Sequence, residues 1–201
     1  MNSGIANYIV GLIDTQTYID KIAGLVTPIT TKQKDITKIV PFACGVQHRD
    51  CVSGKYDDLV PNSRYKSVIY FEDQGVNFGL VKGDRQYFTS KLRMVVWLNM
   101  QKLGEAGCVL SNQVLLSIFA TIPQFPVNFG NYLQMKITPV SEPIKNKNIF
   151  SPYSYDEAVN QYLIAPYDYF AIDFNVSWWM VLECLDTYVP DPAIACPTQP
   201  S

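Results

Sequence analysis

Residues 87–100, YFTSKLRMVVWLNM, alternate between two kinds of side chain. One face of this stretch carries the apolar side chains of Phe88, Leu92, Met94, Val96 and Leu98. The other face is mainly polar, with Trp97 as an exception. A period of two with one polar face is typical of an antiparallel strand that is covered on one side. The stretch therefore predicts a sheet with one buried face and one open face.

Other strands are expected on both sides of this one. Four stretches have a strand-like composition: 36–46, 65–72, 132–140 and 168–184. Pro41 predicts an edge or bulge position for the first of them, because proline cannot donate a ladder hydrogen bond. A turn is expected to begin at Asp73. Since neighbours on a strand point to opposite faces, Glu72 and Asp73 are not expected to share a site.

Two stretches have helical spacing. Residues 4–26 place apolar side chains three and four positions apart, and Pro28 is expected to end this helix. Residues 111–122 repeat the spacing, with Ser111 or Asn112 as the capping residue and Pro123 as the stop. The order of elements predicts an α+β fold. Its sheet is mostly antiparallel and curved, contains a long β-hairpin, and is covered on one face by the two helices.

The chain of 201 residues, 48% of them apolar, suits one domain with its own core. We expect a single domain over residues 1–188, with an aromatic insert at 141–166. Ser154 would cap a short helix within the insert, with Glu157 completing the capping box. The segment 189–201 holds four prolines and is expected to form an extended tail.

The charge pattern excludes some classes of protein. The net charge is −2 and no run of Lys or Arg is present, so the footprint of a duplex-binding protein is missing. Five cysteines, an odd number, argue against a disulfide framework. The N-terminal stretch resembles neither a signal peptide nor a membrane span. We expect synthesis in a reducing cytoplasm and no membrane contact.

One group of residues has the chemistry of a site. Cys44, His48 and Cys51 could bind zinc, with Cys108 as a fourth ligand, or form a Cys–His nucleophile. Their spacing differs from the usual zinc signature, and a buried cysteine, a loop cysteine and a surface histidine explain them as simply. No nucleotide-binding, hydrolase, zinc-protease or EF-hand motif is present. We expect no enzyme activity and no cofactor; the alternative is a small enzyme or zinc-binding module.

Tyrosines gather in and after the insert. Those considered for an interface are Tyr153, Tyr155, Tyr162, Tyr167 and Tyr169. Tyrosine buries a large area at small entropic cost and keeps a polar tip, so it is favoured at protein contacts. A loop folded onto its own core would use the same residues. The sequence leaves both interpretations open.

The order of elements resembles the phage tail-terminator family and related neck and tail-completion rings. The resemblance is carried by IANYIVGLIDTQTYIDKI, SVIYFED, QYFTSKLRMVVWLNM, SNQVLLSIFATI, YLQMKITPV and DYFAIDFNVSWWMVLEC. It spans roughly residues 4–184 and is one of pattern, without a diagnostic motif. The choice of residues also resembles proteins of crAss-like phages.

This resemblance implies a virion protein that forms a homo-oligomeric ring around the neck or tail channel. Its expected partners are copies of itself and the neighbouring neck, tail or portal proteins, with DNA only as passing cargo. Its expected location is the virion neck or tail. The insert at 141–166 and the tail at 189–201 depart from the family pattern, which leaves the position of the ring open.

Overall fold

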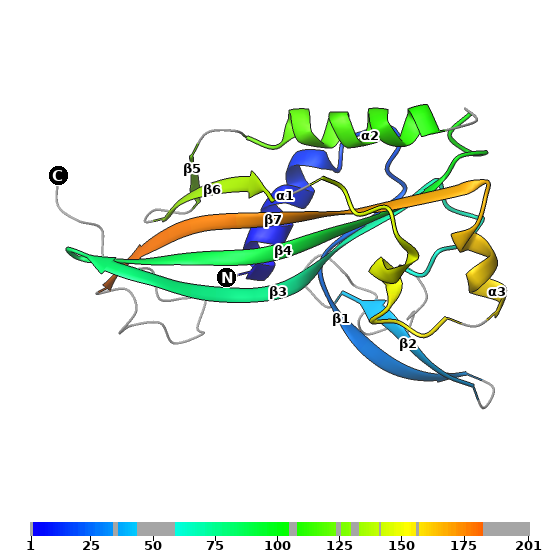
Figure 1. Cartoon of the computed structure of the whole chain (residues 1–201), viewed down its shortest axis with the longest axis horizontal. Helices are drawn as coiled ribbons and strands as arrows, with labels where there is room; N and C mark the ends of the chain where they lie inside the picture. Colours follow the sequence, from blue (N-terminus) through cyan, green and yellow to red (C-terminus); the bar gives the residue numbers. More distant parts are fainter. Residues whose placement is uncertain are drawn as a thin grey trace.

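The computed structural model describes residues 2–33, 36–43, 59–104, 108–123, 126–129, 133–140, 142–155 and 157–182. In this part of the chain, seven strands form one mixed, open sheet with the order β2-β1-β3-β4-β7-β6-β5 (Figure 1). The strands are β1 (Lys21–Gln33), β2 (Ile36–Phe42), β3 (Ser67–Lys82), β4 (Arg85–Asn99), β5 (Val127–Phe129), β6 (Leu133–Pro139) and β7 (Tyr167–Val181).

The helices α1 (Asn2–Ile13) and α2 (Cys108–Thr121) lie on the same face of this sheet (Figure 1). The other face meets the insert, which contains the 3-10 turns η2 (Lys147–Phe150) and η3 (Gln161–Leu163) and the short helix α3 (Glu157–Asn160). The predicted α+β class and the two helices on one face are confirmed.

The long strands β3, β4 and β7 form the centre of the sheet. β3 pairs with β4 from Ser67↔Leu98 to Lys82↔Arg85, and β4 pairs with β7 over its whole length. β1 runs parallel to β3, whereas every other neighbouring pair in this sheet is antiparallel. The prediction of a mostly antiparallel sheet with a long hairpin is therefore confirmed.

Two apolar clusters lie on opposite faces of the sheet. The face toward the helices carries Phe88, Leu92, Met94, Val96 and Leu98, all buried as predicted. The opposite face is open only in part: Lys91 is exposed as predicted, whereas Val95 and Trp97 are fully buried. The insert covers them, because the indole Nε1–H of Trp97 donates to the Tyr162 carbonyl oxygen at 2.7 Å. The Trp97 ring also stacks on Tyr167, with 5.3 Å between ring centroids.

The helix predicted over residues 4–26 is too long. α1 ends at Ile13, and the last six of those residues belong to β1. Ala23 and Val26 face the insert, whereas Ile22 and Leu25 pack toward the helices, so these residues satisfy a strand as well as a helix. Pro28 does not end the element; it lies inside β1, opposite Pro41 of β2. The edge position predicted from Pro41 is confirmed, since β2 is the first strand of the sheet.

The turn predicted at Asp73 is also wrong. β3 continues to Lys82, with an irregular register between Asp73 and Val76. The Asp73 carboxylate accepts the Gly75 backbone N–H at 2.7 Å and the Asn2 amide at 2.8 Å. Gly75 has a φ of 99°, which a residue with a side chain rarely adopts. The turn-forming residues therefore make a bulge within the strand rather than its end.

Ser154 does not act as the predicted helix cap. Its side-chain oxygen accepts the Ile39 backbone N–H at 2.9 Å, and its own N–H donates to the Ile39 carbonyl at 3.0 Å. The insert is thereby attached to β2 at the edge of the sheet. This contact occupies part of the edge that β2 would otherwise present to solvent.

Candidate protein-interaction surface

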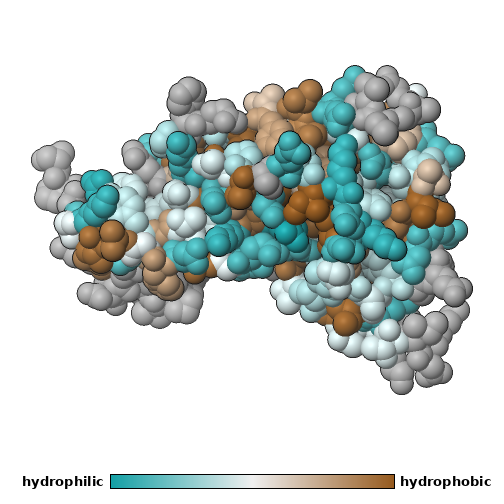
Figure 2. Space-filling model, viewed as in Figure 1, coloured by the Kyte–Doolittle hydropathy of each residue, from teal (hydrophilic) through white to brown (hydrophobic). Residues whose placement is uncertain are grey.

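The hairpin of β3 and β4 projects beyond the helices as an arm, defined here as residues 76–90 (Figure 1). Its outer strand is exposed over its whole distal half. Phe78, Leu80 and Val81 are 80%, 77% and 53% exposed. Figure 2 shows apolar surface at this end of the molecule. Large side chains that stand together in solvent mark a contact site for another molecule.

The arm also has an unpaired strand edge. β1 pairs with β3 only as far as Val26↔Glu72, and beyond that point β3 is paired on its β4 side alone within the described residues. Alternate N–H and C=O groups of β3 therefore point outward from the arm. Such an edge can accept an added strand from another chain.

The exposed Phe78 is held in place by a row of aromatic rings on the helix-side face. Its ring contacts Phe88 with 5.5 Å between centroids, and Phe88 stacks on Trp178 at 4.1 Å. The Trp178 Nε1–H donates to the buried Ser90 hydroxyl at 2.9 Å. The contact with Phe88 restricts the Phe78 ring on one side, which lowers the side-chain entropy that binding would cost.

The opposite face of the arm combines cations with rings. The Arg85 guanidinium lies 4.0 Å from the Trp179 ring centroid, and the Lys82 ammonium lies 5.7 Å from that of Tyr87. From Val76 to Val81 the arm contains no charged residue. An uncharged apolar strand beside a polar rim is the usual composition of a protein contact.

The five tyrosines predicted at an interface pack against this chain's own sheet. Tyr153 is buried, and the others are half-buried against the same cluster, which contains Phe150 and Trp97. Tyr153 stacks on Tyr155 at 6.0 Å, and Tyr162 meets Tyr167 edge-on at 5.3 Å. Tyr169 lies 5.3 Å from Phe150. These contacts represent self-packing; an interface role for their exposed parts stays a prediction.

A carboxylate is buried under these tyrosines. Tyr153 donates its hydroxyl to Glu72 Oε1 at 2.8 Å, and burial raises the pKa of Glu72 above its ordinary value. Arg93 is the register partner of Glu72 on the neighbouring strand β4. Its guanidinium forms a bidentate pair with the Asp173 carboxylate at 2.7 and 3.0 Å. The neighbouring Asp73 bonds to α1 on the other face, so the prediction that the two carboxylates do not share a site is confirmed.

Replacing Tyr153 with Phe should loosen the insert. The variant removes the hydroxyl that donates to the buried Glu72, and we expect it to lose about 1–3 kcal/mol of unfolding free energy. Urea denaturation at neutral pH measures the change. Tyr169→Phe is the control, because its ring packs on Phe150 in the same cluster, and it should stay within about 0.5 kcal/mol of wild type. Equal effects of the two variants would contradict this role of Tyr153.

Glu72 should also make stability depend on pH. A carboxyl whose pKa is raised by folding binds protons more strongly in the folded state. Its contribution to stability therefore falls as pH rises from the unfolded-state pKa through the folded one. Glu72→Gln keeps an acceptor for Tyr153 and removes the titration. We expect the stability difference, variant minus wild type, to increase with pH across this window; parallel pH profiles would show that folding does not raise the pKa of Glu72.

Cys44, His48 and Cys51 lie outside the described residues, as does the side chain of Cys108. In the parts of the chain that the structure describes, no three His, Cys, Asp or Glu side chains come together as a metal site. No helix within the described ranges is long and apolar enough to cross a bilayer.

The sequence predicted the hairpin but missed the distal half of its outer strand, because that strand contains Gly75 and Gly79 and a turn was expected to begin at Asp73. A signal for it exists. Gly83 and Asp84 form a two-residue connection, and glycine followed by aspartate between two strand-like runs is typical of a tight hairpin. Gly83 has a φ of 62°, as such a turn requires.

Comparison with known proteins gives no relative for this surface. No protein-family model matches the chain, and a search of curated proteins finds no match.

Proposed function

We propose that this chain is a virion structural protein that assembles into a homo-oligomeric ring in the neck or tail of a bacteriophage. The arm carries the proposal, because it combines a strand edge that no described strand pairs with and three large exposed apolar side chains. The order of elements, which resembles tail-terminator and neck rings, supports the same role. The protein acts through contacts between proteins and not through chemistry of its own.

A closed ring needs two different contact faces on each subunit, one for the preceding copy and one for the next. The arm supplies one of them. It stands clear of the helices at one end of the molecule, so it can reach a neighbour while the rest of the domain stays intact (Figure 1). Neighbouring neck, tail or portal proteins would contact the top and bottom of the ring, and DNA would pass through its channel.

Mass measurement of the purified protein tests the proposal. Mass photometry should detect a single oligomer whose mass is an integer multiple of the 22.7 kDa chain. The oligomer should form either with the chain alone or after addition of a neck, tail or portal protein from the same phage. Bovine serum albumin added in place of the phage protein is the control for non-specific association. A chain that stays monomeric alone and with each phage partner would contradict the proposal.

A further inference from the structure

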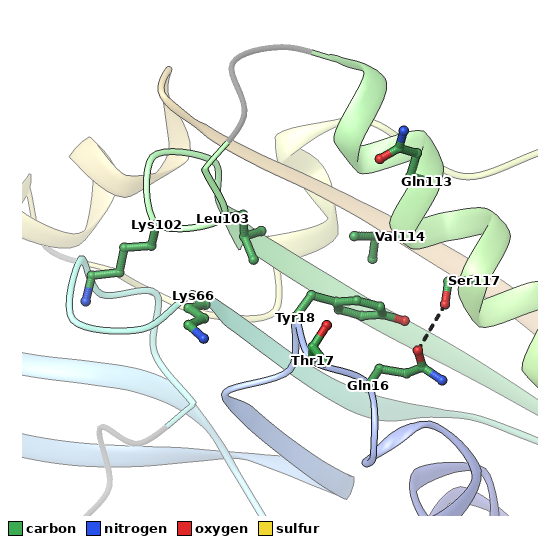
Figure 3. A pocket seen from close by; sticks show the side chains of 9 residues that line it. All are labelled: Gln16, Thr17, Tyr18, Lys66, Lys102, Leu103, Gln113, Val114 and Ser117. Atoms are coloured by element: carbon green, nitrogen blue, oxygen red, sulfur yellow. Dashed lines mark hydrogen bonds between the residues drawn. The ribbon is translucent and has the colours of Figure 1, made fainter.

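A cavity of about 400 Å³ lies at the end of the sheet where β3 begins and β4 ends, far from the arm along these strands (Figure 3). Its walls come from the α1–β1 connection, the start of β3, the β4–α2 connection and α2. The lining residues are Gln16, Thr17, Tyr18, Lys66, Lys102, Leu103, Gln113, Val114 and Ser117. Its volume is in the range of small-molecule sites, about 300–1,000 Å³.

The charge of the lining is entirely positive. Lys66 and Lys102 are both exposed toward solvent, and among the described residues no carboxylate lines the cavity. Asp20 is near, but its side chain accepts the Lys66 backbone N–H at 2.9 Å and is not part of the lining. Lys102 donates one N–H to the Arg64 carbonyl, which leaves two for a ligand. For a chain of net charge −2, this is a local excess of cations.

The rest of the lining is suited to a flat organic group. The Tyr18 ring lies between Lys66 and α2, with Leu103 and Val114 completing an apolar wall (Figure 3). The Tyr18 hydroxyl is enclosed beside Ser117 but forms no hydrogen bond of normal geometry with a described residue. Across from it, Ser117 donates to the Gln16 side-chain oxygen at 3.3 Å.

We infer that this cavity binds a phosphate-bearing ligand of mononucleotide size. Lysines are point charges that bind phosphate, so Lys66 and Lys102 would hold the phosphate. The Tyr18 ring would stack on the base, and the amides of Gln16 and Gln113 offer donors and acceptors to its edge. A free nucleotide and one nucleotide of a single strand share this chemistry. The inference does not depend on the ring proposal, which is tested by mass.

Calorimetric titration of the full chain with AMP, with a twelve-residue single-stranded oligothymidylate and with inorganic phosphate tests the inference. We expect AMP or the oligonucleotide to bind more tightly than phosphate alone. The double variant K66A/K102A should weaken that binding by about 10-fold or more, because the loss of even one charge-assisted hydrogen bond is worth about a factor of ten. Binding of AMP alone identifies a free nucleotide, whereas binding of the oligonucleotide too identifies a unit of a strand.

Two variants separate the cavity from general surface charge. Gln113→Trp changes an exposed residue of α2, keeps both lysines and fills the cavity, so it should also abolish binding. Lys91→Ala removes an exposed lysine in the middle of β4 and should leave the affinity unchanged. The inference is overturned if neither nucleotide probe binds. It is also overturned if Lys91→Ala weakens binding as much as K66A/K102A, or if Gln113→Trp has no effect.

Discussion

A chain that carries Phe78→Asp together with Leu80→Asp is expected to stay a folded monomer under conditions in which the wild-type protein assembles. Both side chains are more than three-quarters exposed, so the substitutions should change the unfolding free energy by no more than about 0.5 kcal/mol each. At a buried contact, two aspartates would replace apolar area with charges that lack partners. We expect the concentration needed for assembly to rise by at least about 100-fold.

Sedimentation velocity over a concentration series measures this change, and circular dichroism checks that the variant is folded. Leu116→Asp is the matched control, because Leu116 is 66% exposed on α2, outside the arm. It introduces the same charge at a similarly exposed apolar residue. Assembly of the arm variant at wild-type concentrations would show that the arm is not a contact between subunits. Equal damage by Leu116→Asp would show that any added charge is sufficient.

Trp97→Ala is expected to cost about 3–5 kcal/mol of unfolding free energy, the largest loss that we predict for one residue. Trp97 is fully buried on the insert side of β4. Its indole N–H donates to the Tyr162 carbonyl and its ring stacks on Tyr167, so the truncation also removes these contacts with the insert. The cavity left behind adds to the lost transfer free energy because a packed sheet relaxes only in part.

Urea unfolding followed by circular dichroism measures this loss. Trp179→Ala is the control, since Trp179 is half-buried on β7 and contacts Arg85 through an exposed cation–π pair. A loss of about 1 kcal/mol or less is expected there. If the two tryptophans proved equally costly, the insert would not be held by Trp97 in the manner described.

The sequence predicted the centre of the fold well, because periodicity there is strong and long. The alternation in 87–100 and 168–184 gave β4 and β7, and the spacing in 111–122 gave α2. It failed at residues 21–26, where a short apolar run fits either period. Pairing with β3 makes that segment a strand, and the local spacing of apolar residues does not indicate such pairing.

The functional surface was harder to predict for a related reason. Whether the tyrosines of the insert face a partner or their own sheet depends on contacts such as Tyr153 with Glu72, 81 positions apart. Composition cannot distinguish the two cases. Asp73 and Gly75 look like the start of a turn, yet the side chain of Asp73 bonds to α1 and the strand continues. Beyond that bulge, β3 continues to Lys82 and forms the outer strand of the arm.

Electron microscopy of the assembled particles tests the central claim most directly. Class averages should show closed rings with rotational symmetry, in which the arm of each subunit lies against the next copy. A single population of monomers, or of two-fold dimers joined through other faces with the arms free in solvent, would contradict it.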